Sequence, residues 1–249
     1  MISWSNLVAY HEFLHTQWKK KLLIKTIRFI RHKGHVAKSI LTGSSKRFYR
    51  GNMLPFLTKH TRYFPVHRIN LCCGPQKVPG YCGIDLWLGA DMVVNLAKRD
   101  LPFRTATLEA AVCTSGINYF SRTQAQFLIR EVWRVLKPGG IARFSVQDMK
   151  LIAQHYVDND VRFFFQKLPD GKQRFEGPTI GDIFVSWFYG YVTAGGPSRY
   201  AYDYESLAYL FREAGFSVIE RRAYLDSRLD HIDKIDNRPE QMFFLEAVK

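Results

Sequence analysis

One stretch organises the chain: Arg68-Ile69-Asn70-Leu71-Cys72-Cys73-Gly74-Pro75-Gln76-Lys77-Val78-Pro79-Gly80-Tyr81-Cys82-Gly83-Ile84-Asp85-Leu86. The pattern predicts a short apolar strand, a tight Gly-Pro turn, a short connector and a second strand that ends at the carboxylate of Asp85. A glycine turn lets backbone N–H groups approach a ligand closely, and an acid after the next strand can accept from ribose hydroxyls. The stretch therefore indicates either a nucleoside-cofactor site or an ordinary turn of an α/β domain.

Strand-like and helix-like patterns alternate from this stretch onward. The helix expected at 122–136 has Ser121 as its cap and Phe127, Leu128 and Val132 on its inner face. This alternation predicts a parallel sheet with right-handed crossovers. The expected strands are 68–72, 81–85, 91–94, 110–114, 140–146, one that begins at Phe216 and a final one at 241–248.

The most specific motif is Arg134-Val135-Leu136-Lys137-Pro138-Gly139-Gly140, which precedes the fifth expected strand. Together with the turn at Gly74 and the acid at Asp85, it resembles the class I S-adenosylmethionine-dependent methyltransferases of the "methyltransferase type 11" group. The resemblance runs from about Arg68 to the C-terminus. It implies a Rossmann-like α/β fold, with a mostly parallel seven-stranded sheet and helices on both faces, and S-adenosylmethionine as cofactor.

The resemblance also implies a set of cofactor contacts at the strand ends. Asp85 would accept from the ribose hydroxyls, Asn95 would meet the adenine and Ser115 would line the methionine side. An alternative for Asp85 is a helix cap or a solvated loop acid. The expected cofactor-binding residues are Asn70, Cys72, Gly74, Pro75, Asp85, Leu86, Asn95, Leu96 and Ser115.

Three positions depart from the family pattern, and they bear on catalysis. Cys72 stands where the family has its first turn glycine, the segment 115–119 lacks the usual acid and histidine, and 198–200 lacks a histidine. No general base is obvious from the sequence. The candidate catalytic residues are Asp148 and Tyr119, with a purely loop-ordering role as the alternative for Asp148.

Charge divides the chain into two parts. Residues 1–68 hold 14 Lys and Arg against one acid, Glu12, while 69–249 hold 22 against 21, within a net charge of +14. We therefore expect a basic helical N-terminal arm at 1–65 and a methyltransferase domain at 66–249. Such asymmetry suggests an anionic partner for the arm, and an apolar stripe beside its lysines suggests a membrane surface. The alternatives are packing on the domain or contact with RNA.

Aromatic residues crowd the region of about 150–200, including Phe163, Phe164, Trp187 and Phe188. An insert at the carboxyl ends of the strands lies where ligands bind in open α/β sheets. We therefore expect a substrate cap here. The alternative is that these aromatics only form the insert's own small core.

These features together lead to one leading function and two alternatives. The leading hypothesis is methyl transfer to a small molecule or to a glycan- or lipid-linked acceptor. The alternatives are a non-catalytic member that binds an anionic partner, and an RNA methyltransferase, which is disfavoured because no recognised RNA-binding module precedes the fold.

The sequence contains no Cys-x-x-Cys pair, so we do not expect a metal site. With neither a signal peptide nor a membrane span apparent, we expect a cytoplasmic protein, peripheral to a membrane if the arm binds one. The oligomeric state is open.

Overall fold

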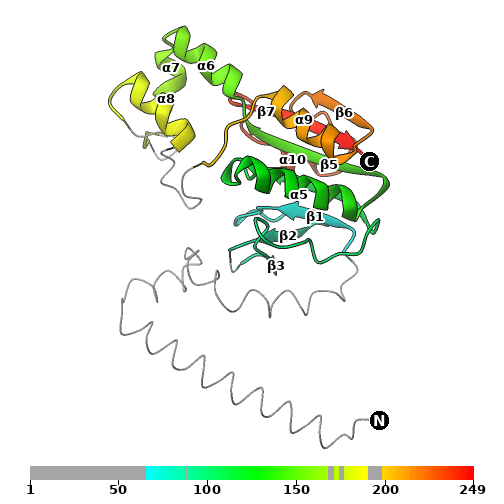
Figure 1. Ribbon diagram of the computed structural model, residues 1–249. Helices are drawn as coiled ribbons and strands as arrows, with labels where there is room; N and C mark the ends of the chain where they lie inside the picture. The colour runs from blue at the N-terminus through cyan, green and yellow to red at the C-terminus, as the bar shows by residue number, and fades with distance from the viewer. Residues whose placement is uncertain (1–65, 88, 168–170, 174–176, 190–197) are drawn as a thin grey trace, which may run out of the picture. The chain divides into compact units, whose positions relative to one another are not determined.

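The computed structural model describes residues 66–249, except for 88, 168–170, 174–176 and 190–197 (Figure 1). The arm predicted at 1–65 lies outside the described residues. Among the described helices, none is both long and apolar enough to cross a membrane.

A seven-stranded sheet forms the centre of the domain, in the order β3-β2-β1-β4-β5-β7-β6. Strands β1 to β5 run parallel, while β7 lies antiparallel between β5 and β6. The mostly parallel seven-stranded sheet predicted from the sequence is therefore confirmed. The strands are β1 (Arg68–Leu71), β2 (Cys82–Asp85), β3 (Met92–Val93), β4 (Leu108–Thr114), β5 (Leu136–Gln147), β6 (Val218–Arg222) and β7 (Met242–Val248).

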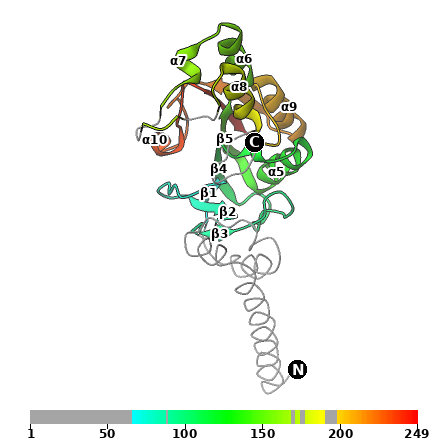
Figure 2. The same cartoon turned by 90° about the vertical axis from the view of Figure 1, so that its left-hand side faces the viewer.

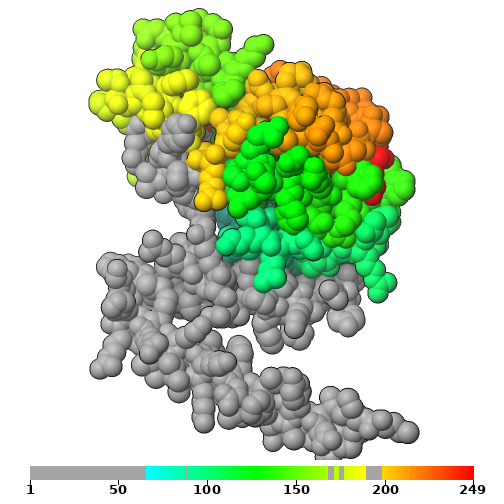
Figure 3. All heavy atoms as spheres, viewed as in Figure 1, coloured from blue at the N-terminus to red at the C-terminus, as the bar shows by residue number. Residues whose placement is uncertain are grey.

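One face of the sheet packs against α5 (Arg122–Val135) and α9 (Tyr204–Ala214), whose atoms form a continuous surface in Figure 3. Ser121 caps α5 as predicted, because its hydroxyl accepts from the Gln124 N–H and the Gln124 side chain accepts from the Ser121 N–H. The main hydrophobic core lies between this face and the two helices. It contains every second residue of the central strands, such as Ile69, Ala111 and Phe144.

The opposite face of the sheet is covered by the segment 223–241, which includes the short helix α10 (Ile232–Ile235), as Figure 2 shows. The buried Arg143 of β5 fixes this segment, because its guanidinium donates to both carboxylate oxygens of Asp236, at 3.2 and 2.6 Å. The fully described connection 72–81, between β1 and β2, contains no helix. Residues far along the chain thus complete the cover of this face, together with Val78 and Tyr81 of the connection.

The predicted insert is helical and follows β5 directly. It consists of α6 (Met149–Val157), α7 (Val161–Phe164) and α8 (Ile180–Tyr189), which we call the cap. Its aromatic residues do build a small core of their own, together with two isoleucines. The core residues are Ile152, Phe163, Phe164, Ile183 and Trp187.

Element boundaries differ from the predicted ones at one notable place. Helix α5 ends at Val135, and β5 already begins at Leu136, so Pro138-Gly139-Gly140 lies in the first part of β5. Gly139 has a φ of 77° and its N–H donates to the Lys249 carbonyl at 2.9 Å, while the Lys249 N–H donates to Gly140. The end of the chain thus pairs with this glycine segment and extends the β5–β7 ladder.

Candidate functional site

The turn after β1 is built on left-handed backbone at two of its residues. Cys72 has a φ of 55° and Gly74 a φ of 52°. The Cys72 N–H donates to the Ile84 carbonyl at 2.8 Å, which carries the β1–β2 pairing one residue past the strand. A Cβ added to Gly74 would meet nothing within 4 Å, so this side of the turn borders open space that a ligand can enter.

Asp85, at the carboxyl end of β2, accepts a hydrogen bond directly from the backbone of this turn. Its Oδ2 accepts from the Gly74 N–H at 2.9 Å, and its Oδ1 accepts from the N–H groups of Leu86 and Trp87 at 2.5 and 3.2 Å. The half-buried carboxylate therefore organises both loops of the predicted site. A carboxylate offers about four acceptor positions, so three backbone donors leave room for a ribose hydroxyl.

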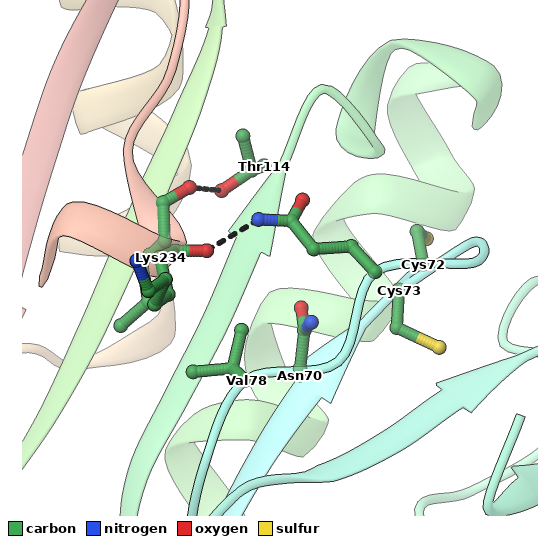
Figure 4. A pocket seen from close by; sticks show the side chains of 8 residues that line it. Asn70, Cys72, Cys73, Val78, Thr114 and Lys234 are labelled. Carbon is green, nitrogen blue, oxygen red and sulfur yellow. Dashed lines mark hydrogen bonds between the residues drawn. The ribbon is translucent and has the colours of Figure 1, made fainter. Parts of the chain in front are cut away.

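A small hollow lies between this turn and the segment that covers the sheet's second face (Figure 4). Asn70, Cys72 and Thr114 line it from the ends of β1 and β4, and Lys234 and Ile235 line it from α10. Two hydrogen bonds tie α10 across the hollow. The Thr114 hydroxyl donates to the Ile235 carbonyl at 3.0 Å, and the Gln76 side chain donates to the Lys234 carbonyl. Because the strand order reverses between β1 and β4, this is the edge where open α/β sheets bind ligands.

The side chain of Cys72 is half-buried and packs against the main core. Hydrogen bonding to Cys113 and burial raise the pKa of Cys72 well above its ordinary value, and burial raises the pKa of the neighbouring Cys73 to about 12. All four cysteines, including Cys82, are free thiols. At neutral pH the thiols of Cys72 and Cys73 are therefore protonated, and these two residues add no negative charge to the turn.

Asn95 and Leu96, which were expected to meet the adenine, are both buried. The Asn95 Oδ1 accepts from the Ala97 N–H at 3.2 Å, which shapes the loop after β3. Leu96 packs into the main core. Their role towards a cofactor stays a prediction.

Ser115 has left-handed backbone, with a φ of 53°, and its hydroxyl accepts from Arg238 at 2.5 Å. The two residues join the loop after β4 to the loop before β7. Arg238, Thr114 and Ile235 were not predicted as site residues. For Ile235, the sequence signal is the short Ile-Asp-Lys-Ile-Asp segment before the last strand, whose two isoleucines recur at helical spacing.

The two candidate catalytic residues lie in different settings. Asp148 caps α6, because its Oδ1 accepts from the Lys150 and Leu151 N–H groups, and its Oδ2 accepts from Arg221 at 2.9 Å. These contacts favour the loop-ordering alternative for Asp148. Tyr119 is half-buried in the 3-10 turn Ile117–Tyr119 after β4. A catalytic role for either residue stays a prediction.

Comparison with known proteins gives the class. Residues 77–144 match the family model described as a methyltransferase domain. This match and the strand order both support the class I S-adenosylmethionine-dependent methyltransferase fold that the resemblance predicted.

The individual relatives are only distantly similar to this chain in sequence. A ubiquinone/menaquinone biosynthesis C-methyltransferase, UbiE, of Desulfotalea psychrophila is 31% identical over 137 residues, which are 55% of this chain and 50% of that relative. The chain thus spans about half the length of that protein. A solved methyltransferase of Thermotoga maritima, described as a possible histamine N-methyltransferase, is 13% identical, with a TM-score of 0.42 over 82% of this chain and 97% of that one. One of Archaeoglobus fulgidus is 12% identical, with a TM-score of 0.43 over the same shares.

Proposed function

We propose that this protein transfers a methyl group from S-adenosylmethionine to a small molecule or to a glycan- or lipid-linked acceptor held beneath the cap. The observation that carries the proposal is the hydrogen bond between the Gly74 N–H and Asp85 at 2.9 Å, at the point where the strand order reverses. It joins the two elements that a nucleoside cofactor needs, a close backbone turn and a carboxylate for the ribose. The name of the Desulfotalea psychrophila relative supports the small-molecule alternative, with carbon as the methylated atom.

The residues present fit the cofactor. The open space beside Gly74 admits a ligand against the backbone of the turn. The turn would hold the methionine end, Asp85 would accept from the ribose, and the loop at Asn95 would border the adenine. When bound, the cofactor supplies an electrophilic methyl group on a sulfonium.

What this chain must add is orientation of the acceptor. Direct displacement at a methyl group needs the nucleophile in line and at close range, and a fixed pair of binding sites supplies that alignment. The cofactor turn and the cap follow β1 and β5, whose carboxyl ends lie at one edge of the same parallel sheet. The domain can therefore hold both partners over one edge.

Calorimetric titration of the full chain with S-adenosylmethionine and with S-adenosylhomocysteine tests the first half of this proposal. We expect saturable binding of both, competing for one site. Transfer of a labelled methyl group to a panel of phenols, amines, thiols and glycans then tests the second half. Absence of cofactor binding would overturn the proposed function, while binding without transfer to any of the panel would favour the non-catalytic alternative.

A further inference from the structure

Arg238 lies in the connection between β6 and β7, next to the loop that follows β4. Its guanidinium donates to the Ser115 hydroxyl at 2.5 Å and to the side-chain oxygen of Asn237 at 3.0 Å. Ser115 directly follows β4, and the next residue, Gly116, packs against Cys72 of the cofactor turn. These contacts lead from the cofactor turn, across the loop after β4, to a cationic side chain.

The backbone at Arg238 is held in an uncommon conformation. Arg238 has a φ of 53°, in the left-handed region, and it precedes Pro239, which restricts the residue before it. Its carbonyl accepts from the Gln241 N–H at 3.2 Å, and two residues earlier Asp236 accepts from Arg143 through both carboxylate oxygens. Strained backbone persists only where its surroundings fix it, and it clusters at active sites and ligand clamps. The guanidinium is therefore presented at a fixed place.

The methionine moiety of the proposed cofactor carries a carboxylate that needs a partner. A carboxylate that leaves water must be paired with a cation or with several N–H donors. In the cofactor turn the Gly74 N–H already donates to Asp85, which is itself an anion. Arginine suits a carboxylate well, because its planar fork can donate to both oxygens at once.

Two lysines near the turn are rival candidates for this role. Lys77 pairs with Asp91 at 2.5 Å, and Asp91 directly precedes β3. Lys234 lines the hollow, but its ammonium pairs with Asp233 at 2.9 Å, and both side chains are 60% exposed. An exposed lysine is flexible, and water screens its charge. Arg238 is half-buried and oriented by two side-chain hydrogen bonds, so it is better prepared to bind a carboxylate.

We propose that Arg238 binds the carboxylate of the methionine moiety of S-adenosylmethionine. This inference rests on the proposed function, to which it adds a cofactor contact from the connection before the last strand. The guanidinium pairs with the carboxylate, and the Ser115 hydroxyl and the Asn237 side chain hold the guanidinium in position. Segment 223–241 then has a second task besides covering the sheet, because it brings a positive charge to the cofactor.

The test compares two ligands that differ in this carboxylate alone. They are S-adenosylhomocysteine and its decarboxylated analogue, S-adenosyl-3-thiopropylamine. Their affinities are measured by calorimetric titration of the full chain as wild type, Arg238→Gln, Arg238→Lys and Lys234→Gln. We expect the wild type to bind S-adenosylhomocysteine about ten- to hundredfold more tightly than the analogue, as hydrogen bonds between charged groups require.

Each variant has its own signature. Arg238→Gln lowers the affinity for S-adenosylhomocysteine about tenfold or more and leaves that for the analogue unchanged. Arg238→Lys keeps the charge but loses the fork, so its affinity for S-adenosylhomocysteine lies in between. Lys234→Gln changes neither affinity by more than about twofold, because an exposed cation is screened. A loop that is merely disturbed by the lost Ser115 contact would weaken both ligands equally, which separates binding from a structural role.

Three results would overturn the inference. The first is equal affinity of the wild type for the two ligands, a result that depends on no variant being folded. The second is an equal loss of both ligands in Arg238→Gln, and the third is a larger loss of S-adenosylhomocysteine in Lys234→Gln than in Arg238→Gln. If the wild type binds neither ligand, the proposed function fails together with this inference. If S-adenosylhomocysteine binds tightly whether or not Arg238 is present, only this inference fails.

Discussion

The side chain of Cys72 occupies the space that a side chain on Gly116 would need. A Cβ added to Gly116 would lie 2.5 Å from the Cβ of Cys72 and 2.9 Å from its sulfur. The two residues belong to the loops after β1 and β4, which are neighbouring parallel strands. The departure from the expected turn glycine at Cys72 is thus matched by a glycine on the facing loop.

This contact predicts a coupled pair of substitutions. Gly116→Ala should destabilise the domain by about 1–3 kcal/mol, the usual cost of overpacking a filled site. Part of that loss should be recovered in the double variant Cys72→Gly/Gly116→Ala, although the Cys113 sulfur, 2.8 Å from the added Cβ, remains. Denaturant unfolding of the four members of the cycle measures the coupling. Strictly additive effects would contradict the contact.

A second prediction follows from the left-handed backbone of Cys72. A non-glycine residue in this conformation costs roughly 1–2 kcal/mol, which glycine does not incur. Cys72→Gly should therefore be more stable than Cys72→Ala by about 1 kcal/mol, even though alanine loses less of the side chain. The comparison cancels the loss of the thiol, which both variants share. An alanine variant as stable as the glycine variant would mean that the turn is built differently.

Asp85→Ala should reduce cofactor affinity at least about tenfold, because hydrogen bonds to a charged acceptor are worth ~1.5–3 kcal/mol each. The matched control is Asp91→Ala. Asp91 is also a carboxylate that accepts from a backbone amide, that of Gly83 at 2.7 Å, but it lies before β3 and outside the proposed contacts. Titration with S-adenosylhomocysteine should separate the two variants. Equal affinities in two folded variants would remove Asp85 from the site.

The buried thiol of Cys73 should make stability depend on pH. Burial raises the pKa of Cys73 to about 12, whereas an unfolded thiol titrates near about 8.5. Below about pH 8.5 the thiol is protonated in both states and contributes no pH dependence. As the pH rises from there towards 12, only the unfolded state releases this proton, so the free energy of unfolding falls by at most ~1.4 kcal/mol per unit. Cys73→Ala should lose this part of the alkaline slope, and identical slopes would refute the burial effect.

The charge of the N-terminal residues predicts salt-sensitive binding to anionic membranes. Each basic residue near such a surface contributes about 1 kcal/mol, over a Debye length of roughly 8 Å. The full chain should therefore co-sediment with anionic vesicles at low salt, and less so when Lys19, Lys20, Lys21 and Lys25 are changed to glutamine. Neutral vesicles are the control. Binding that ignores both salt and the four lysines would argue against an electrostatic surface role.

The sequence predicted most of the fold because its signals are local. The strand-turn-strand pattern around Gly74 and the cap at Ser121 depend on neighbours within a few residues, and both are found as predicted. The covering of the sheet's second face could not be predicted in the same way. It depends on Arg143 meeting Asp236, a contact between residues 93 positions apart that no periodicity encodes.

The site was predictable in part for the same reason. Asp85 was expected at the end of its strand, and its contact with Gly74 follows from the pairing of β1 and β2. Thr114 and Ile235 could not be named in this way, because the hydrogen bond between them joins positions 121 residues apart.

Segment 223–241 is synthesised long after β4, which it covers, and this order affects how the chain folds during synthesis. Ala110 and Val112 of β4 are buried by Leu229 and Ile235, which are made more than a hundred residues later. At ~5–20 residues per second, this face of the nascent sheet lacks that part of its cover for roughly 6–25 s after β4 has left the ribosome's catalytic centre. Contacts of such long range also slow folding, because the loop must close before they form. The growing chain thus presents an apolar surface that chaperones can bind until α10 has been synthesised.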